Sequence, residues 1–203
     1  MFARLYERAA PAMDRQGAAG HRRRLLAGLT GDVVEVGAGG GANFVHYPDG
    51  VGSVLALEPE PYLRERAARR ASEARTPVRV VDAVAEQIPL ADGSVDVVVA
   101  SLVLCSVTDQ AIALREMHRV LRPGGQLRFY EHVAAPTRAR RALQRLVDAT
   151  AWPLLAGGCH TGRDTVAAIR TAGFAVDAVA VVDVGPAHLS PAWPHVLGRA
   201  SRA

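Results

Sequence analysis

Four glycines occupy five consecutive positions in the stretch Val33–Asn43 (VVEVGAGGGAN), directly after an apolar run. Glycine is needed where backbone passes close beneath a ligand or takes a positive φ angle. The stretch therefore predicts a strand that ends in a tight, ligand-binding turn. Gly37, Gly39 and Gly41 are spaced as GxGxG, while Gly37, Gly39 and Ala42 also satisfy the looser dinucleotide pattern. The glycines alone leave the ligand open.

Two acids near this turn narrow the choice between a dinucleotide and S-adenosylmethionine. Glu58 lies 19 residues beyond Gly39, at the end of the second predicted strand, where a carboxylate can bind ribose hydroxyls. Both cofactors contain that ribose, so Glu58 does not discriminate between them. Glu35 lies inside a predicted buried strand, where a carboxylate is costly unless it is paired. It would repel a pyrophosphate and attract a cationic amino group, which favours S-adenosylmethionine.

The elements that position these residues follow from the hydrophobic pattern. Strands that alternate with helical segments indicate βαβ units and a parallel sheet covered on both faces. After one or two N-terminal helices over 2–29, broken near Pro11 and Gly17, we expect strand 33–37, a helix from about 41, strand 53–57, helix 60–74, strand 78–81, strand 95–100, helix 109–121 and strand 126–131. Residues Arg122–Gly125 (RPGG) are predicted to form a turn before the last of these strands.

The pattern becomes looser after Pro136. Helices are expected over 138–149 and 163–172, then a strand from Phe174 to Val184 and an antiparallel partner around 193–197. The predicted fold class is α/β, a doubly wound, mostly parallel Rossmann-like sandwich with an antiparallel C-terminal strand and an N-terminal helical cap. We expect one domain over 1–203, with a cap (1–29), a cofactor-binding core (30–135) and an acceptor-side lid with C-terminal strands (136–203).

Composition excludes several classes of protein. The chain has 203 residues, 49% hydrophobic, which suffices for one buried core. All 24 basic residues are arginines; the dense cluster at 21–24 and the looser clusters at 64–70 and 138–145 are interpreted as helical faces rather than as a nucleic-acid stripe. The last cluster could also touch a membrane surface. No apolar run approaches the roughly 20 residues of a membrane span, and charges recur in residues 1–16, so we expect a cytoplasmic protein, monomer or homodimer.

Several motifs together resemble one family. They are EVGAGGGAN, LALEPEP, AEQIPLADGSVDVVVASLVLCSV, REMHRVLRPGGQL and FYEHVAA, in register over roughly 30–135. They look like a class I S-adenosylmethionine-dependent methyltransferase of the type 11 group, which includes the quinone-biosynthesis C-methyltransferases. LVLCSV, EHVAA, Gly158-Cys159 and the terminal PHVLG make the methyltransferase-like alkyl thiol S-methyltransferases the most similar subgroup. Animal members carry an N-terminal membrane anchor, which we do not expect here.

The resemblance implies a set of cofactor-binding residues. Gly37, Gly39 and Gly41 would pack under the methionine portion, with Glu35 near its amino group. Glu58 would bind the ribose, Pro59 would contact the adenine, and Ala85 and Glu86 would belong to the adenine loop. The family often has Asp or Asn before that Ala-Glu pair, but Val84 is found here. Asp82 either substitutes for the missing acid or caps a strand. Ser101, at the end of the fourth strand, would lie where the methyl group meets its acceptor.

The acceptor decides which other residues matter. Methyl transfer from a sulfonium needs mainly in-line alignment. A thiol acceptor also needs a base, because only a few per cent of a thiol is ionised to thiolate at neutral pH. His132 follows the fifth predicted strand, whose end faces the ligand crevice, and is the predicted base; His160 is the alternative. Cys105 and Cys159 belong to no CxxC pair, so we expect buried, hydrophobic cysteines and no metal.

The predicted function is methyl transfer from S-adenosylmethionine to a small hydrophobic acceptor, with a thiol first among the candidates. A C- or O-methyltransferase acting on a quinone or phenol, and an N-methyltransferase acting on a lipid head group, are the enzyme alternatives. A protein that binds S-adenosylmethionine without turnover, or an NAD-dependent oxidoreductase, would be a different class. Peripheral contact with lipid is compatible with the arginines at 138–145.

Overall fold

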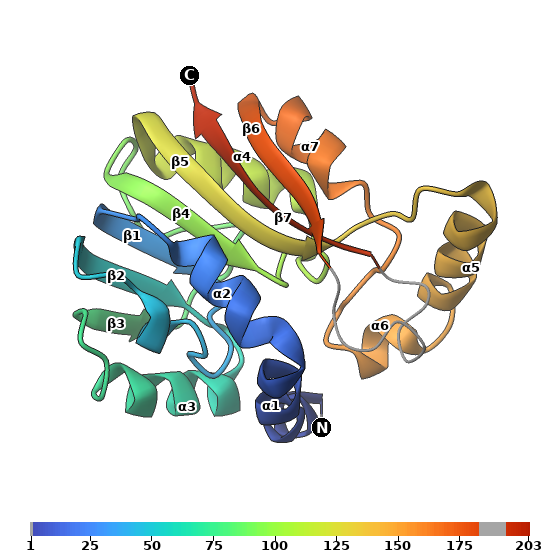
Figure 1. Ribbon diagram of the computed structural model, residues 1–203, viewed down its shortest axis with the longest axis horizontal. Helices are drawn as coiled ribbons and strands as arrows, with labels where there is room; N and C mark the ends of the chain where they lie inside the picture. The colour runs from blue at the N-terminus through green and yellow to red at the C-terminus, as the bar shows by residue number, and fades with distance from the viewer. Residues whose placement is uncertain (1, 183–193) are drawn as a thin grey trace.

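A computed structural model describes residues 2–182 and 194–203. Figure 1 shows one seven-stranded sheet in the order β3-β2-β1-β4-β5-β7-β6. β1 to β5 are parallel, and β7 runs antiparallel to both of its neighbours. This is the predicted mostly parallel sheet with antiparallel C-terminal strands. The strands are β1 (Gly31–Val36), β2 (Val51–Leu57), β3 (Val78–Val81), β4 (Val95–Ser101), β5 (Leu121–His132), β6 (Phe174–Val182) and β7 (His195–Arg202).

Helices cover both faces of the sheet, because alternate residues of each central strand point to opposite sides. Val34 and Val36 of β1 join a core with α4 and α7, whereas Val33 joins a second core with α2 and α3. Both faces of β1 are therefore buried, as its uninterrupted apolar pattern predicts. The helices of these two layers are α2 (Ala19–Leu26), α3 (Pro61–Ala71), α4 (Gln110–Val120) and α7 (Thr165–Thr171).

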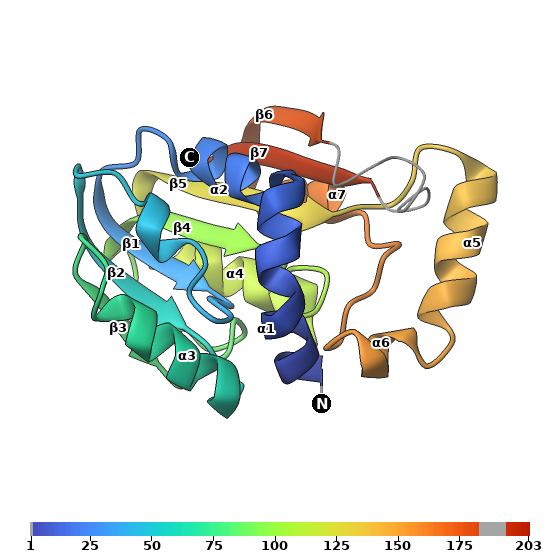
Figure 2. The ribbon, with the colours of Figure 1, turned by 60° about the horizontal axis from the view of Figure 1, so that its bottom comes forward.

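The N-terminal segment forms α1 (Phe2–Met13), a short π-helical turn (Asp14–Ala18) and α2. The predicted break at Gly17 is confirmed, since Gly17 leaves the helical region with a φ of 119°. The predicted break at Pro11 is wrong: α1 continues through it, because one proline removes a single backbone hydrogen bond and need not end a helix. In Figure 2, α1 lies beside the end of the sheet to which the β4 arrow points.

The helix expected from about residue 41 is also wrong. Residues 39–43 form turns, followed by a short 3-10 helix, Phe44–His46. Gly41 has a φ of 82°, and the bonds from Gly41 N to Ala38 O and from Phe44 N to Gly41 O span three residues rather than four. Pro48 then disfavours helical geometry at Tyr47. The segment between the turn and β2 is too short to hold more than this single 3-10 turn.

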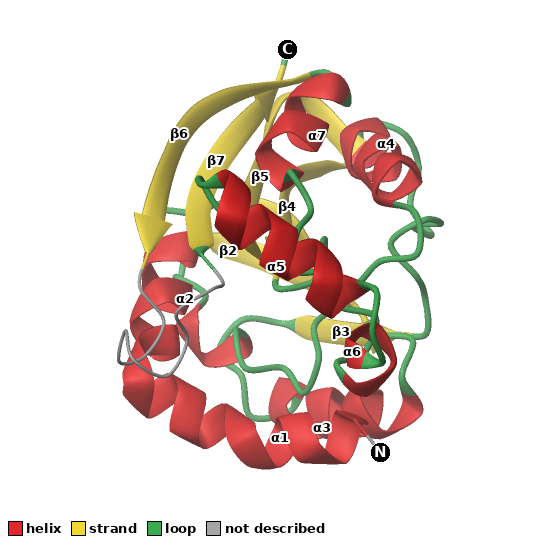
Figure 3. Ribbon diagram, turned by 90° about the vertical axis from the view of Figure 1, so that its right-hand side faces the viewer, coloured by secondary structure: helices red, strands yellow, loops and turns green. Residues whose placement is uncertain are grey.

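The C-terminal third mixes confirmed and unexpected elements. β5 begins at Leu121, five residues earlier than predicted, and the RPGG residues form an irregularity between two paired stretches. α5 (Arg138–Asp148), α7, β6 and β7 match the predicted elements, while α6 (Trp152–Leu155) was not predicted. The parts of the predicted strands at 183–184 and 193 lie outside the described residues. Figures 1 and 2 show α5 and α6 set apart from the sheet, beyond the carboxyl ends of the strands, and Figure 3 shows α5 in front of those ends.

No helix among the described residues is both long enough and apolar enough to span a bilayer.

Candidate active site

A cavity of about 320 Å³ opens at the carboxyl ends of β1, β2 and β4. It is where ligands bind in open α/β sheets, at the point where strand order reverses. Phe2 and Tyr6 of α1 contribute to one wall, so the N-terminal helix partly covers it. Seven of the predicted site residues line this cavity: Gly37, Gly39, Glu58, Pro59, Ala85, Glu86 and Ser101.

The glycine turn is shaped by two different constraints. Gly37 has a φ of 64°, and a Cβ added there would lie 2.3 Å from Cγ2 of Val103. Gly41 has a φ of 82°, and its Cβ would lie 2.6 Å from the ring of Phe44. Gly39 (φ 56°) lines the cavity, and a Cβ there would lie 3.7 Å from the Tyr6 ring, an ordinary van der Waals contact. Gly37 and Gly39 thus face the site, whereas Gly41 allows the turn to pack on Phe44 and is not among the lining residues.

Glu58 ties the glycine turn to the end of β2. Its carboxylate accepts hydrogen bonds from Gly39 N at 2.7 Å and from Glu60 N at 2.9 Å. The side chain is largely buried, and burial raises the pKa of this carboxyl despite the two amide bonds. Each oxygen keeps a further lone pair, so the carboxylate can still accept the hydroxyl hydrogens of a ribose.

Glu35 lies behind the turn, beside a smaller pocket that shares Tyr6, Gly37, Gly39 and Ser101 with the main cavity. It is 1% exposed, and its two oxygens accept hydrogen bonds from Asn43 Nδ2 and Tyr47 Oη, both at 2.8 Å. Burial raises the pKa of Glu35 to about 7, although these two bonds act in the opposite direction. The buried acid is thus partnered, as the sequence requires, but largely by neutral groups.

Arg22 supplies a cation to the same pocket and was missed in the sequence. It is 4% exposed, and its guanidinium donates hydrogen bonds to the side-chain oxygens of Asp14 and Asn43, both at 3.3 Å. Its Nη2 and the Oγ of Ser101 are buried without a hydrogen-bond partner among the described residues. The signal was available: Arg22 precedes Leu25 and Leu26 by three and four residues and so shares their buried helical face. A cation and a buried acid in one pocket suit a zwitterionic head group.

The side of the cavity formed by β2 and the loop after β3 carries the residues predicted near the adenine. Pro59, Ala85 and Glu86 line it, and Glu86 also accepts a hydrogen bond from Asp109 N at 3.1 Å. Val84 lines the cavity too. Asp82 does not: its exposed carboxylate pairs with Arg64 at 3.0 Å. Since Arg64 also donates to the carbonyls of Glu58 and Pro59, Asp82 supports the wall from outside.

The loop after β4 forms the opposite wall and is held by Glu131, a second residue that sequence reasoning missed. Leu102 has a φ of 58°, a conformation that costs a non-glycine residue about 1–3 kcal/mol. The fully buried Glu131 carboxylate accepts hydrogen bonds from the backbone amides of Val103, Leu104 and Cys105. Burial raises the pKa of Glu131 to about 7. An acid directly before His132 in an apolar strand was the available signal.

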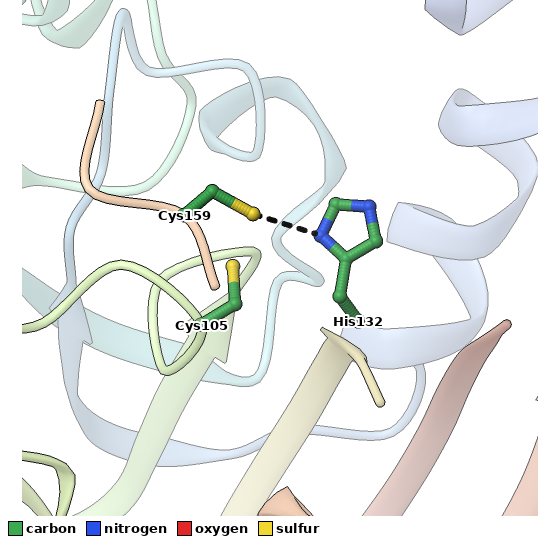
Figure 4. A group of neighbouring side chains, drawn as sticks. All are labelled: Cys105, His132 and Cys159. Carbon is green, nitrogen blue, oxygen red and sulfur yellow. Dashed lines mark hydrogen bonds between the residues drawn. The ribbon is translucent and has the colours of Figure 1, made fainter. Parts of the chain in front are cut away.

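His132 meets two cysteines beside this wall. Its Nδ1 lies 3.7 Å from Sγ of Cys159 (Figure 4). The His132 ring also packs on that of His195, with ring centroids 4.0 Å apart. Both cysteines are buried and free of disulfides. The Cys105 thiol donates a hydrogen bond to the Cys159 sulfur, which lowers the pKa of Cys159 and raises that of Cys105. His160 instead contacts Gly158 O at 2.8 Å and Arg163. Of the two predicted histidines, only His132 joins the cysteines.

Comparisons with known proteins agree with this geometry. The family described as "Methyltransferase domain" matches residues 34–129. Thiol S-methyltransferase TMT1B of Mus musculus is 39% identical over 180 residues, covering 86% of this chain and 73% of that protein. A geranyl diphosphate methyltransferase solved with S-adenosylmethionine has a TM-score of 0.70 at 16% identity, covering 93% of this chain and 85% of that one. The [4+2]-cyclase SpnF reaches 0.72 at 20% identity, covering 92% and 82%.

The structural neighbours establish the fold, and a cyclase among them illustrates that this fold hosts more than one chemistry. The sequence relatives go further. The chain belongs to the class I S-adenosylmethionine-dependent methyltransferases, in the family that contains the mouse protein. It is a methyltransferase, and its cofactor is S-adenosylmethionine.

The residues present fit this cofactor. The buried, unpartnered atoms of Arg22 and Ser101 and the acid Glu35 surround the pocket under the glycine turn, as a carboxylate and an ammonium group would require. Gly37 and Gly39 line both that pocket and the main cavity. A dinucleotide pyrophosphate would instead place negative charge beside Glu35. When bound, the cofactor supplies a methyl group already activated on a sulfonium.

Proposed function

We propose that this chain methylates small hydrophobic thiols. The observation that carries the proposal is the 39% identity, over 86% of the chain, to a mouse protein named thiol S-methyltransferase. The cavity supports it, because its walls near the end of β4 are largely apolar, with Phe2, Leu102, Val103 and Val107 among them. An apolar wall favours a neutral, hydrophobic acceptor over a charged one.

The chain's own residues would contribute binding and thiol ionisation. The acceptor thiol loses its proton, its sulfur forms a bond to the methyl carbon, and the carbon–sulfonium bond breaks to leave S-adenosylhomocysteine. We assign His132 to promoting the loss of that proton, since it lies at the carboxyl end of β5 beside the strand that carries Ser101. Predicted cofactor contacts would hold the donor sulfur in line: Glu35, Gly37 and Gly39 at the methionine end, Glu58 at the ribose, Pro59, Ala85 and Glu86 at the adenine.

The test is transfer of labelled methyl from S-adenosylmethionine to a panel of hydrogen sulfide, alkyl and aryl thiols, a catechol, a demethylated quinone and phosphatidylethanolamine vesicles. The thiols are expected to be labelled in preference to every other class. Preferential labelling of the quinone, the catechol or the lipid would overturn the thiol assignment and leave the methyltransferase assignment intact.

We further propose that α5 and α6 lie against an anionic membrane surface, from which a hydrophobic acceptor would be supplied. α5 reverses the usual burial pattern of a helix: its one buried residue is the polar Gln144, while Leu146 is 64% exposed. Leu154 of α6 is 86% exposed. Exposed arginines lie on the same helix as Leu146, and exposed apolar and basic residues on one helix are typical of an interfacial helix. These arginines are Arg138, Arg140, Arg141 and Arg145.

Sedimentation with vesicles tests this surface. The chain is expected to pellet with phosphatidylglycerol-containing vesicles, to stay in the supernatant with pure phosphatidylcholine, and to be released by salt. The double substitution Leu146→Gln and Leu154→Gln should weaken the binding to vesicles. The control, Val45→Gln, changes a comparably exposed residue in the 3-10 helix beside the glycine turn and should leave the binding unchanged. Equal binding to both kinds of vesicle, or none to either, would contradict the proposal.

A further inference from the structure

Three side chains from distant parts of the sequence converge beside the active-site cavity. Cys105 lies in the loop after β4, His132 at the end of β5, and Cys159 in the loop after α6. Figure 4 shows the two sulfurs and the imidazole facing a common point. Sγ of Cys105, a ring nitrogen of His132 and Sγ of Cys159 all lie within 4.8 Å of one another.

The spacing of the Cys159 and His132 donor atoms agrees with a tetrahedral metal site. Zinc–sulfur bonds of about 2.3 Å and zinc–nitrogen bonds of about 2.0–2.1 Å place a sulfur and a nitrogen ligand roughly 3.6 Å apart. Cys159 Sγ and His132 Nδ1 are 3.7 Å apart. Two thiolates and an imidazole are a soft donor set, which favours zinc over magnesium or calcium.

The backbones that carry these donors are fixed independently of any ion. The amide of Cys105 donates to Glu131, and its carbonyl accepts from His160 N at 2.8 Å. The amide of Cys159 donates to Ala156 O at 3.2 Å. The Glu131 carboxylate is occupied by three backbone amides. These backbone contacts hold Cys105 and Cys159 in place and use none of the three donor atoms.

From this geometry we propose that Cys105, His132 and Cys159 bind one zinc ion, in a three-ligand site whose fourth position takes the sulfur of the acceptor thiol. A zinc site with two cysteines, one histidine and an exchangeable position is a catalytic type. The cluster adjoins the cavity: Ser106 lines the cavity and its Oγ lies 3.5 Å from Cys105 Sγ, and Gly157 lines it two residues before Cys159.

The role of the fourth position rests on the proposed thiol activity, whereas binding of the metal does not. At that position the acceptor thiol releases its proton to solvent, and the resulting thiolate attacks the methyl carbon. His132 then promotes ionisation as a ligand rather than as the proton acceptor that the sequence predicts. The sequence also led us to expect no metal, because the cysteines are separated by 54 positions rather than paired in a motif.

Cobalt provides a readout that is separate from activity. The full chain, reduced and stripped with a chelator, is titrated with Co²⁺ alone. We expect one equivalent to give the strong visible absorption of a tetrahedral site and a near-ultraviolet thiolate charge-transfer band, both abolished by Zn²⁺. Cys159→Ser and His132→Ala should each weaken cobalt binding more than tenfold, since even partners outside the ligand shell cost about 10–100-fold in affinity. His160→Ala, in the same loop but outside the cluster, should leave the spectrum unchanged.

Two further measurements separate the possible failures. Thermal stabilisation by S-adenosylhomocysteine shows whether each variant is folded. Propane-1-thiol added to the cobalt protein should intensify the charge-transfer band as a third sulfur joins the metal. No cobalt spectrum, or one that survives loss of Cys159, overturns the metal site even if thiols are methylated by metal-free protein. A cobalt spectrum unaffected by propane-1-thiol overturns the assignment of the fourth position alone.

Discussion

Glu58 and Asp82 are two carboxylates assigned to the cofactor, in very different surroundings. Glu58 is 6% exposed and bonded to the glycine turn, whereas the Asp82 side chain is 67% exposed and pairs with Arg64. We expect Glu58→Ala to weaken binding of S-adenosylhomocysteine at least tenfold, equivalent to about 1.4 kcal/mol. Asp82→Asn should change it less than about twofold, because an exposed ion pair contributes little. Isothermal titration calorimetry measures both.

The two variants serve as controls for each other. A large loss of affinity in Asp82→Asn would show that the loop after β3 rearranges and that Asp82 replaces the acid missing at Val84. Unchanged affinity in Glu58→Ala would remove Glu58 from the cofactor site.

The raised pKa of Glu35 predicts that cofactor binding releases a proton. A cationic amino group nearby favours the ionised carboxylate, so the pKa of Glu35 should fall in the complex. Affinity for S-adenosylhomocysteine should therefore increase as pH rises toward about 7, the pKa in the free protein, and level off above it. At pH 7, about half a proton should be released per chain, measured by calorimetry in buffers of different ionisation enthalpy.

Glu35→Gln is the matched variant for this effect, since it keeps the size of the side chain and does not titrate. It should abolish the proton release near pH 7. Proton release of the same size in Glu35→Gln would assign the effect to another buried acid, with Glu131 the first to examine.

At the residue scale, the sequence predicted several acids and glycines that line the cavity, because their chemistry is local to the turn. Gly37, Gly39 and Glu58 line the cavity as expected. Arg22 was not predicted, since three consecutive arginines look like a solvated face until the two leucines that follow are used to orient the helix. Asp82 could not be placed either, because the direction of a loop side chain depends on a tertiary partner, here Arg64.

At the scale of elements, α5 is attached to the rest of the chain through polar groups. Gln144 accepts a hydrogen bond from Ala135 N at 2.8 Å and donates to Val133 O and Thr161 O, at 3.1 and 2.8 Å. Gln144→Leu would leave these buried backbone groups unpaired, at about 1–3 kcal/mol each. We expect this variant to lower the free energy of unfolding, measured by urea denaturation, by about 2 kcal/mol or more.

Leu146→Gln, two residues further on but exposed, should change that free energy by less than about 0.5 kcal/mol. The usual preference for apolar residues in the interior is reversed here. A larger loss in Leu146→Gln than in Gln144→Leu would mean that the leucine face is packed in solution.

Helices and strands were predicted well where the pattern of apolar residues was strong, and poorly where the backbone geometry of single residues decided the structure. The central strands and α4 follow from apolar runs and turn residues. The helix expected after the glycine turn failed because positive φ at Gly41 and the proline at 48 leave only three-residue turns. α5 was predicted as a helix, but its inverted orientation depends on contacts of Gln144 with Thr161, far along the chain.

At the scale of the whole molecule, the antiparallel end of the sheet depends on one close approach. A Cβ at Gly198 of β7 would lie 2.3 Å from the Phe129 ring of β5 and 2.7 Å from Ala178 O of β6. Gly198→Ala should therefore destabilise the chain by about 1–3 kcal/mol. Gly20→Ala, in α2 with open space around it, should stabilise it by about 0.5–1 kcal/mol.

Urea denaturation of the two alanine variants measures both changes against the same unfolded state. Equal effects of the two substitutions would show that the contact of β7 with Phe129 relaxes without cost.

The overall sandwich could be predicted from the order of strands and helices, but the convergence of Cys105, His132 and Cys159 could not. Each precedes the next by 27 positions, and their meeting depends on how two loops fold over the end of β5. Sequence spacing carries no information about such loops. This is why the cysteines were predicted as separate hydrophobic residues.

The position of β7 has a consequence for biosynthesis. β6 pairs with β7 alone among the described strands, and β7 also completes β5, yet β7 is the last of these strands to be translated. Until residues 195–202 have been synthesised and have left the ribosome, β5 has an unpaired edge and β6 has no partner among the described strands. Such edges promote pairing between chains. We therefore expect chaperone engagement late in synthesis, and release once β7 has emerged.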